Sequence, residues 1–340
     1  MSEPTLLAGL DIGGSKVLAV AVDVSAPDGR PRVVESTRLA TGLGPEGVVD
    51  TAARALGALT AGLSAGAPHE VFSGVGIGIP GLVDARRGKI THAVNLGVGP
   101  GGLALADRLG RRLDLPVVVE NDVNAAALGA ASHLRLGRID MAYLSIGTGI
   151  AAGIVLDGRL RRGPHGAAGE IGHIPIDPSG PVCGCGQHGC LEALASGSAI
   201  AARWTPRPGS ELPAGQDLFA AAAHGDAAAK ELRDEVAGYL ADATRMLALT
   251  VDVDLIVLGG GVAEIGEPLR HAVAKALDRQ AGSSPFLRGL DLSARLSVVP
   301  RDQPVAAIGA ALLATEPPAL ATSDDTPATL DGALTEDLPA

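Results

Sequence analysis

Apolar residues along the chain form two kinds of segment: short runs that predict strands, and longer stretches with helical periodicity. The short runs end at glycines or polar residues, as strands commonly do. They cover residues 6–10, 17–22, 75–79, 117–119, 141–146 and 255–258. The helical stretches cover residues 47–65, 103–113, 123–131, 227–249 and 305–313, and a Pro- and Gly-containing break lies at 205–209. Strands that alternate with helices predict an α/β protein.

Composition limits the possible classes of protein. A chain of 340 residues with 46% hydrophobic residues is expected to form about two domains with ample core. No apolar run could span a bilayer, and the first residues, MSEPTLL, lack the basic start of a signal peptide, so we expect a cytoplasmic protein with no membrane partner. The net charge of −11 and the aromatic content of 2% argue against nucleic-acid binding. Residues 317–340, an acidic tail without a basic residue, are expected to be disordered.

A glycine-rich stretch, DIGGSK at residues 11–16, joins the first two apolar runs and predicts a β-hairpin. Exposed N–H groups of such a turn can cradle phosphate oxygens, and Lys16 adds a positive charge. Asp11 could hold Mg²⁺ directly or through water. The stretch is not a Walker A loop, because the Gly-Lys-Ser/Thr order is absent. An ordinary turn is an equally good interpretation of this pattern alone.

Two further glycine turns follow predicted strands. GTG at residues 147–149 comes after the run at 141–146 and leads to a second hairpin that turns at Asp157-Gly158. GGG at residues 259–261 follows the run at 255–258, and bare glycines there would let the flat face of a base lie on the backbone. Taken alone, GGG indicates only a turn.

Polar residues also follow the strand predicted at 117–119. Glu120, Asn121 and Asp122 come between this strand and the helix predicted at 123–131. Ligands of open α/β sheets bind beyond the carboxyl ends of the strands, where these residues are expected. Asn121 or Asp122 could instead cap the helix, which is a common role for both residue types.

All three cysteines of the chain, Cys183, Cys185 and Cys190, fall within eight residues, and His173 precedes them. Three thiolates and one imidazole form a closed tetrahedral set that suits a structural Zn²⁺. A disulfide with one spare thiol is the alternative, which the odd cysteine number and the missing secretory signal disfavour. His165 and His188 are also near, but His173 is favoured because a ligand from outside the cluster ties two segments together.

Two glutamates flank the proposed metal ligands. Glu170 lies just before His173, and Glu192 lies just after Cys190. A metal that fixes both segments would pre-organise these carboxylates for hydrogen bonds to a polyhydroxylated ligand. Solvated loop charges are the alternative interpretation of the same spacing.

The motifs GEIGH and CGCGQHGCLEALASG, in residues 169–197, resemble those of the ROK family of repressors, uncharacterised reading frames and sugar kinases. Weaker motifs extend the resemblance over residues 7–314. It implies a two-domain actin-like (ribonuclease H-like) ATPase fold with the active site in the interdomain cleft. The expected N-terminal domain is 1–119 plus the last helix in 304–316, and the larger domain is 120–303 with a zinc loop at 173–190.

The resemblance also implies a reaction, in which the γ-phosphoryl group of ATP, bound with Mg²⁺, is transferred to a hexose hydroxyl, by default the 6-OH of glucose. Asp122 would be the base, and His173 would face the sugar with one side of its ring and zinc with the other. The residues expected at ATP and its phosphates are Asp11, Gly13, Gly14, Ser15, Lys16, Gly147, Thr148, Gly149, Gly259, Gly260 and Gly261. Those expected at the sugar are Gly81, Asn95, Asn121, Asp122, Glu170, His173 and Glu192. A turn-forming role for Asn95 is a close alternative.

One feature departs from the pattern of the family, and several questions of function, substrate and assembly stay open. Ala151 and Ala152 stand where the family often has glycine, which weakens the case for close phosphate approach there. A silent sugar-binding protein is one alternative, and a sugar-sensing regulator is another, although only ten residues precede Asp11. Mannose, fructose, N-acetylglucosamine and N-acetylmannosamine remain possible substrates. ATP or polyphosphate as donor, and a homodimer or a homotetramer as assembly, are also left open.

Overall fold

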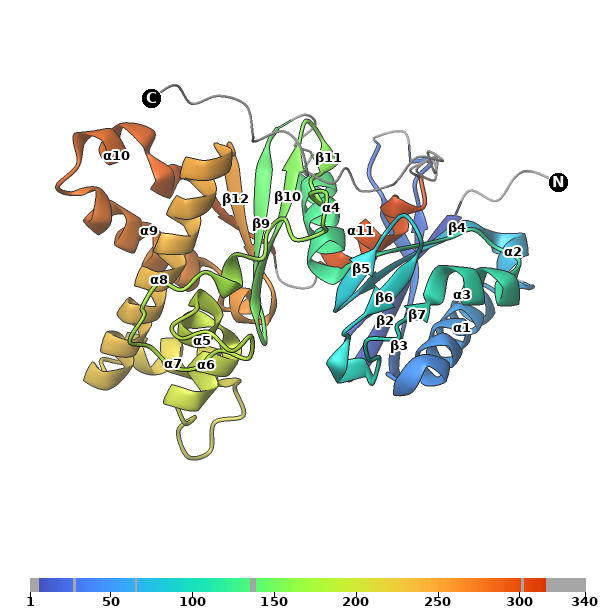
Figure 1. The fold of residues 1–340 in the computed structure, drawn as a ribbon, viewed down its shortest axis with the longest axis horizontal. Coiled ribbons are helices and arrows are strands. Elements are labelled where there is room, and N and C mark those ends of the chain that lie inside the picture. The colour runs from blue at the N-terminus through green and yellow to red at the C-terminus, as the bar shows by residue number, and fades with distance from the viewer. Residues whose placement is uncertain (1–5, 27–28, 65, 135–138, 301–302, 316–340) are drawn as a thin grey trace, which may run out of the picture.

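The computed structural model describes residues 6–26, 29–64, 66–134, 139–300 and 303–315, so the acidic tail at 317–340 lies outside the described residues. Two five-stranded sheets form the centres of two lobes that lie side by side (Figure 1). No helix within the described ranges has both the length and the apolar character that a membrane span requires.

The first sheet has the strand order β3-β2-β1-β4-β8. Its strands are β1 (Leu6–Ile12), β2 (Lys16–Asp23), β3 (Arg32–Ala40), β4 (Phe72–Ile79) and β8 (Val117–Asn121). The β1–β2 hairpin is antiparallel, as predicted, whereas β4 and β8 run parallel to β1. Helices α1 (Gly44–Gly62), α2 (Pro68–Val71) and α3 (Leu105–Leu113) belong to the same lobe (Figure 1). Buried Leu, Ile and Val side chains of the sheet and of α1 and α3 form its core.

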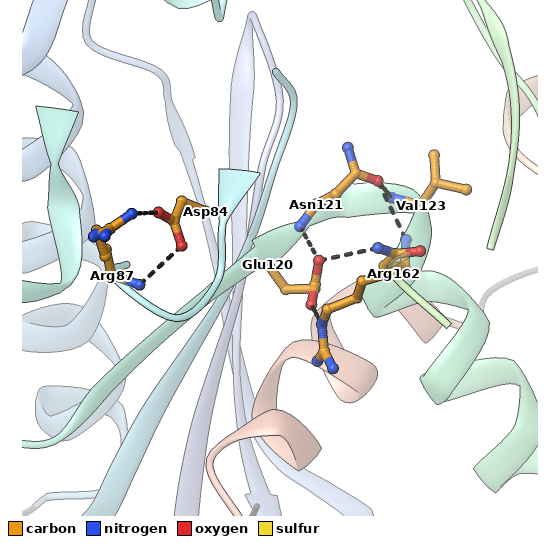
Figure 2. Close-up of polar contacts among 7 residues, drawn as sticks. Asp84, Arg87, Glu120, Asn121, Val123 and Arg162 are labelled. Carbon is orange, nitrogen blue, oxygen red and sulfur yellow. Dashed lines mark hydrogen bonds and ion pairs between the residues drawn. The ribbon is translucent and has the colours of Figure 1, made fainter. Parts of the chain in front are cut away.

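A small three-stranded sheet extends this lobe and was not predicted. It contains β5 (Leu82–Asp84), β6 (Lys89–Thr91) and β7 (Leu103–Ala104), and the 3₁₀ helix η1 (Val94–Leu96) follows β6. The predicted helix at 103–113 therefore begins two residues too early, because Leu103 pairs with Ile90 in this sheet. Arg87 closes the β5–β6 turn by an ion pair with Asp84 at 3.0 Å (Figure 2).

The second sheet has the order β11-β10-β9-β12-β13. Its strands are β9 (Met141–Ile146), β10 (Ile150–Leu156), β11 (Arg159–Leu160), β12 (Leu255–Gly259) and β13 (Leu296–Val298). The α-helices of this lobe are α5 (Leu191–Ala195), α6 (Gly197–Arg203), α7 (Ala214–Ala223), α8 (Ala227–Val251), α9 (Glu267–Ala281) and α10 (Pro285–Leu290). Its 3₁₀ helices are η2 (Ile171–His173), η3 (Gly261–Ile265) and η4 (Leu292–Arg295). The long helix α8 supplies much of the second core.

Helices α4 (Asp122–Leu134) and α11 (Val305–Leu313) pack against each other between the two sheets (Figure 1). Glycine permits their close approach, because a Cβ atom on Gly129 would lie 1.9 Å from the carbonyl oxygen of Val305. Helix α11 also covers the first sheet: a Cβ atom on Gly9 of β1 would lie 2.0 Å from the Ala307 oxygen. The last helix thus packs on the N-terminal sheet as expected, while the domain boundaries at 119/120 and 303/304 stay predictions.

Candidate active site

The first glycine turn, residues 13–15, lies between β1 and β2 and is closed by local hydrogen bonds. The Gly13 N–H donates to the Lys16 carbonyl oxygen at 2.9 Å, and the Thr41 hydroxyl donates to the Gly13 carbonyl oxygen at 2.7 Å. The turn also touches a predicted sugar residue, since a Cβ atom on Gly14 would lie 3.1 Å from Cβ of Asn95. The structure therefore places the predicted phosphate turn beside η1.

Gly81 lies in the turn that follows β4, with a φ of +111° that favours glycine. A Cβ atom there would lie 2.9 Å from the carbonyl oxygen of Thr91 and 2.9 Å from Cβ of Ala93. Because Ala93 directly precedes η1, the turn of Gly81 packs against the segment that carries Asn95. Both predicted sugar residues of this lobe are thus neighbours.

Asn121 ends β8 (Figure 2), and Asp122 directly after it begins α4 at the carboxyl end of the strand. Oδ1 of Asn121 accepts hydrogen bonds from the backbone N–H groups of Val123 at 2.9 Å and Asn124 at 3.3 Å. Oδ1 of Asp122 also accepts from Val123, at 3.0 Å. Both side chains therefore have the capping role that was considered for them. Each uses only its Oδ1 atom for it, so the Asn121 amide NH₂ group and the second carboxylate oxygen of Asp122 take no part in these bonds.

Asp11 and Asp122 come together because β1 and β4 pair in register. Asp11 lies opposite Gly78 on β4, and a Cβ atom on Gly78 would lie only 3.5 Å from Cα of Asp122. The pKa of Asp11 is raised from 3.8 to about 6, chiefly by burial and also by the charge of Asp122, while the charge of Lys16 acts to lower it. Burial likewise raises the pKa of Asp122. Hydrogen bonds from the backbone act to lower it, and the charge of Glu170 adds to the increase. Three carboxylates thus face one region, which favours bound cations and hydroxyl donors.

The second glycine turn, residues 147–149, joins β9 to β10, and its Gly147 N–H donates to the Gly149 carbonyl oxygen at 2.9 Å. Glu192, in the first turn of α5, reaches this turn: its Oε2 accepts from the Ile150 backbone N–H at 3.0 Å. A Cβ atom on Gly149 would lie 2.3 Å from the same oxygen. A side chain at 149 would therefore displace the Glu192 carboxylate from its place beside the turn. The sequence contains no local signal for this contact, which joins residues 42 positions apart.

The third glycine turn begins at the end of β12, which runs parallel to β9. Turns 147–149 and 259–261 therefore lie at the same edge of the sheet. A Cβ atom on Gly259 would lie 2.1 Å from the Tyr143 hydroxyl oxygen, which accepts a hydrogen bond from the Gly260 N–H at 3.2 Å. Gly260 has a φ of +80°. Packing on the buried Tyr143 ring thus explains why β12 ends in glycine.

His173, Cys183, Cys185 and Cys190 converge in one cluster, with one possible ligand atom of each within 4.8 Å of all the others. Nδ1 of His173 lies 3.7 Å from Sγ of Cys183, and the sulfurs of Cys185 and Cys190 are 3.7 Å apart. Tetrahedral Zn²⁺, with bonds of about 2.3 Å to sulfur and about 2.1 Å to nitrogen, would separate its ligands by about 3.6–3.8 Å. The donor set and its spacing therefore fit zinc.

The alternatives to this ligand set find no support among the described residues. The three cysteines are free, and a sulfur separation of 3.7 Å is far from a disulfide bond. Nδ1 of His188 lies 3.3 Å from the Gly180 carbonyl oxygen, and neither His188 nor His165 belongs to the cluster. Of the three histidines considered, the structure thus brings only His173 together with the cysteines.

The GEIGH segment, residues 169–173, packs directly on β10. A Cβ atom on Gly169 would lie 1.8 Å from the carbonyl oxygen of Ala152, and one on Gly172 would lie 1.9 Å from that of Ile150. The Ala152 N–H donates to the Gly169 carbonyl oxygen at 2.7 Å. Both glycines of the motif are therefore explained by contact with β10, and the contact fixes Glu170 and His173 beside the second glycine turn.

The family model of the ROK family matches residues 7–316. The chain belongs to the ROK family. It is 38% identical over 233 residues to the glucokinase of Halalkalibacterium halodurans, a match that covers 63% of this chain and 70% of that protein. It is 37% identical to the N-acetylmannosamine kinase of Escherichia coli O157:H7, over 74% of this chain and 82% of that protein.

A solved structure is similar over almost the whole chain. The ROK family glucokinase of Streptomyces griseus, in complex with glucose and AMPPNP, superposes with a TM-score of 0.72 at 31% identity, covering 91% of this chain and 99% of that one. The predicted α/β fold of the actin-like ATPase type is thereby confirmed for this ROK protein.

Proposed function

We propose that this ROK sugar kinase transfers the γ-phosphoryl group of ATP to the 6-OH of glucose. The observation that carries the proposal is the position of Asp122, a carboxylate at the carboxyl end of β8 that stands beside Asp11 and responds to the charge of Glu170. The similarity to glucokinases, one of them solved with glucose and AMPPNP, supports glucose and ATP as the ligands.

Asp122 is the proposed general base. It would accept the proton of the attacking sugar hydroxyl, which contributes about 10²–10⁴-fold to the rate of such reactions. Its pKa is raised by burial, so its carboxylate is a stronger base than that of an exposed aspartate. The helix N-terminus and the Val123 N–H hold the carboxylate in place.

The phosphates are proposed to lie along the glycine turns. Amides of turns 13–15 and 147–149, with Lys16, would position and neutralise them, which is the main catalytic task in phosphoryl transfer. Residues 259–261 would border the adenosine. Asp11 offers the carboxylate oxygen that Mg²⁺ prefers, and when bound the ion would neutralise phosphate charge. The raised pKa of Asp11 means that a cation there relieves an unfavourable charge.

The sugar would be oriented by side chains from both lobes. Asn95 and the turn of Gly81 come from the first lobe, and Glu170, His173 and Glu192 come from the second. Nδ1 of His173 faces Cys183 in the cysteine cluster, so Nε2 is the ring nitrogen left for the sugar. A zinc ion on Nδ1 would fix that tautomer and hold the imidazole in place.

A coupled assay of ADP release over a panel of hexoses tests the proposal. Glucose should give the highest kcat/KM, and ATP with Mg²⁺ should outperform polyphosphate as donor. N-acetylmannosamine is the competing substrate, because a kinase of that sugar is 37% identical to this chain. A higher kcat/KM for N-acetylmannosamine would replace glucose, and no ADP release with any hexose would favour a silent sugar-binding protein.

A further inference from the structure

A buried carboxylate stands two residues before the proposed base. Glu120 is only 2% exposed, at the carboxyl end of β8. Its Oε1 accepts a hydrogen bond from the Asn121 backbone N–H at 2.8 Å (Figure 2). The same oxygen accepts from Nδ2 of Asn124 at 3.0 Å. Its Oε2 forms an ion pair with Nε of Arg162. Glu120 is thus enclosed by these partners, an arrangement suited to holding neighbouring residues in place.

Arg162 belongs to a segment that lies 42 residues further along the chain. It follows β11, and its side chain is 34% exposed. The Ala168 N–H donates to the Arg162 carbonyl oxygen at 3.3 Å, and the next residue, Gly169, is bonded to β10. The position of Arg162 is therefore tied to the start of the GEIGH segment, which carries Glu170 and His173.

We propose that Glu120 and Arg162 are a positioning pair that fixes the proposed base relative to the sugar-orienting segment. The inference rests on the proposed function. Asp122 lies between Asn121 and Asn124, and Glu120 holds both of these residues. A shift of the Glu120 carboxylate therefore moves the Asn121 backbone before Asp122 and the Asn124 side chain after it, while Arg162 links the same carboxylate to the loop before Glu170.

The expected size of the effect follows from burial. A buried carboxylate that loses its cation keeps its desolvation cost, so it relaxes toward other partners or admits water. A misplacement of about 1 Å in a phosphoryl-transfer site can cost about 10²-fold in rate. Loss of Arg162 should thus lower kcat more than it raises the KM for either substrate, because Arg162 itself contacts neither in the proposed arrangement.

Arg162→Met tests the pair, and Arg161→Met is its matched control, since the neighbouring Arg161 is exposed and is tied to Ile154 only through its backbone. Arg162→Met should lower kcat about 10–100-fold with KM values within about threefold of wild type. Arg162→Lys should recover part of kcat because it restores the charge without the guanidinium geometry. Arg161→Met should match wild type.

The partner variant separates pairing from general destabilisation. Glu120→Gln combined with Arg162→Met leaves no unpaired buried charge, so the double variant should be more active than Arg162→Met alone, by about fivefold or more. The proposal would be overturned if Arg161→Met lowered kcat as much as Arg162→Met does. It would also be overturned if the fold losses in kcat of the single variants Glu120→Gln and Arg162→Met simply multiplied in the double variant.

Hydrogen exchange measured by mass spectrometry tests the pair without reference to catalysis. Arg162→Met should speed exchange in two separate peptides, 117–128 and 161–173, whereas Arg161→Met should speed neither. Faster exchange only around residue 162 would refute the link between the segments. A wild-type protein that phosphorylates no sugar would refute the proposed function instead, and the exchange result would still decide whether the pair joins the two segments.

Discussion

The Glu192 carboxylate accepts a hydrogen bond from the Ile150 backbone N–H at 3.0 Å, immediately after the second glycine turn. Its other oxygen lies 3.9 Å from Sγ of Cys183. One side chain therefore touches the cysteine cluster and the proposed phosphate turn, in addition to its proposed role at the sugar. Substitution there should affect both substrates, which would distinguish Glu192 from a residue that contacts the sugar alone.

Glu192→Ala should raise the KM for ATP and for sugar about tenfold each, because the loss of a hydrogen bond to a charged group is worth about 1.5–3 kcal/mol. Glu192→Gln retains an oxygen that can accept from Ile150, so its KM for ATP should stay within about threefold of wild type while the KM for sugar rises. Steady-state kinetics with each substrate varied in turn measures both effects. An unchanged KM for ATP in Glu192→Ala would show that the Ile150 contact has no part in nucleotide binding.

Asp122→Asn keeps the shape and the capping oxygen of the side chain but removes the base. The kcat should fall about 10²-fold or more, with a small change in the sugar dissociation constant. Calorimetric titration with glucose, alongside the ADP-release assay, separates the two quantities. Full activity in this variant would leave Asp122 with its helix-capping role only.

Asp11→Asn should stabilise the protein at neutral pH while it lowers activity. The pKa of Asp11 is about 6 in the folded protein against an ordinary 3.8, so the folded state holds a proton that the unfolded state has lost between these pH values. The free energy of unfolding therefore falls as pH rises from 3.8 to 6, by up to about 3 kcal/mol. Asp11→Asn removes this pH-dependent loss. Its free energy of unfolding, measured with denaturant, should therefore exceed that of wild type by most of this amount at pH 7 and by about half of it at pH 5.

The exposed Asp278→Asn provides the control for this experiment, and its effect on the free energy of unfolding should be small at both pH values. If Asp11→Asn were no more stable than wild type at pH 7, another group would have to stabilise the negative charge of Asp11 in the metal-free protein. That result would contradict the destabilising effect expected from burial of this carboxylate beside Asp122.

The cysteine cluster predicts about one Zn²⁺ per chain by elemental analysis, with four protein ligands. Cys185→Ser and His173→Ala should each lose the metal and weaken glucose binding, whereas His188→Ala should lose neither. The fold should survive metal loss because the core of the second lobe is large. Metal retention in His173→Ala together with metal loss in His188→Ala would mean that the fourth ligand had been chosen wrongly.

Local patterns predicted the central strands of both sheets and the longest helix, and they missed many of the shorter elements. The strand at 141–146 and the helix at 305–313 agree with the structure residue for residue, because glycine bounds the first and proline precedes the second. Strands β5, β6 and β7 have only two or three residues each, too few for an alternating pattern. Their existence depends on partners elsewhere in the chain.

The site was predicted to a similar extent. The clustered cysteines predicted a metal site, since their spacing is itself the signal, and the structure brings them together with His173. Glu120 was noted only as one of three polar residues after a strand, and its burial with Arg162 could not be foreseen. A charged residue in a sequence is expected at the surface unless its partner is known, and no local pattern connects positions 120 and 162.

Helix α11 covers β1 and β4 through backbone contacts at Gly9 and Gly76, where a Cβ atom would lie 2.0 and 1.7 Å from helix carbonyl oxygens. In the chain, β1 precedes the whole second lobe and α11 follows it. One face of the N-terminal sheet must therefore stay uncovered until the second lobe has been synthesised. The first lobe is consequently expected to be completed later than the segments of the second lobe, although its sheet comes earlier in the chain.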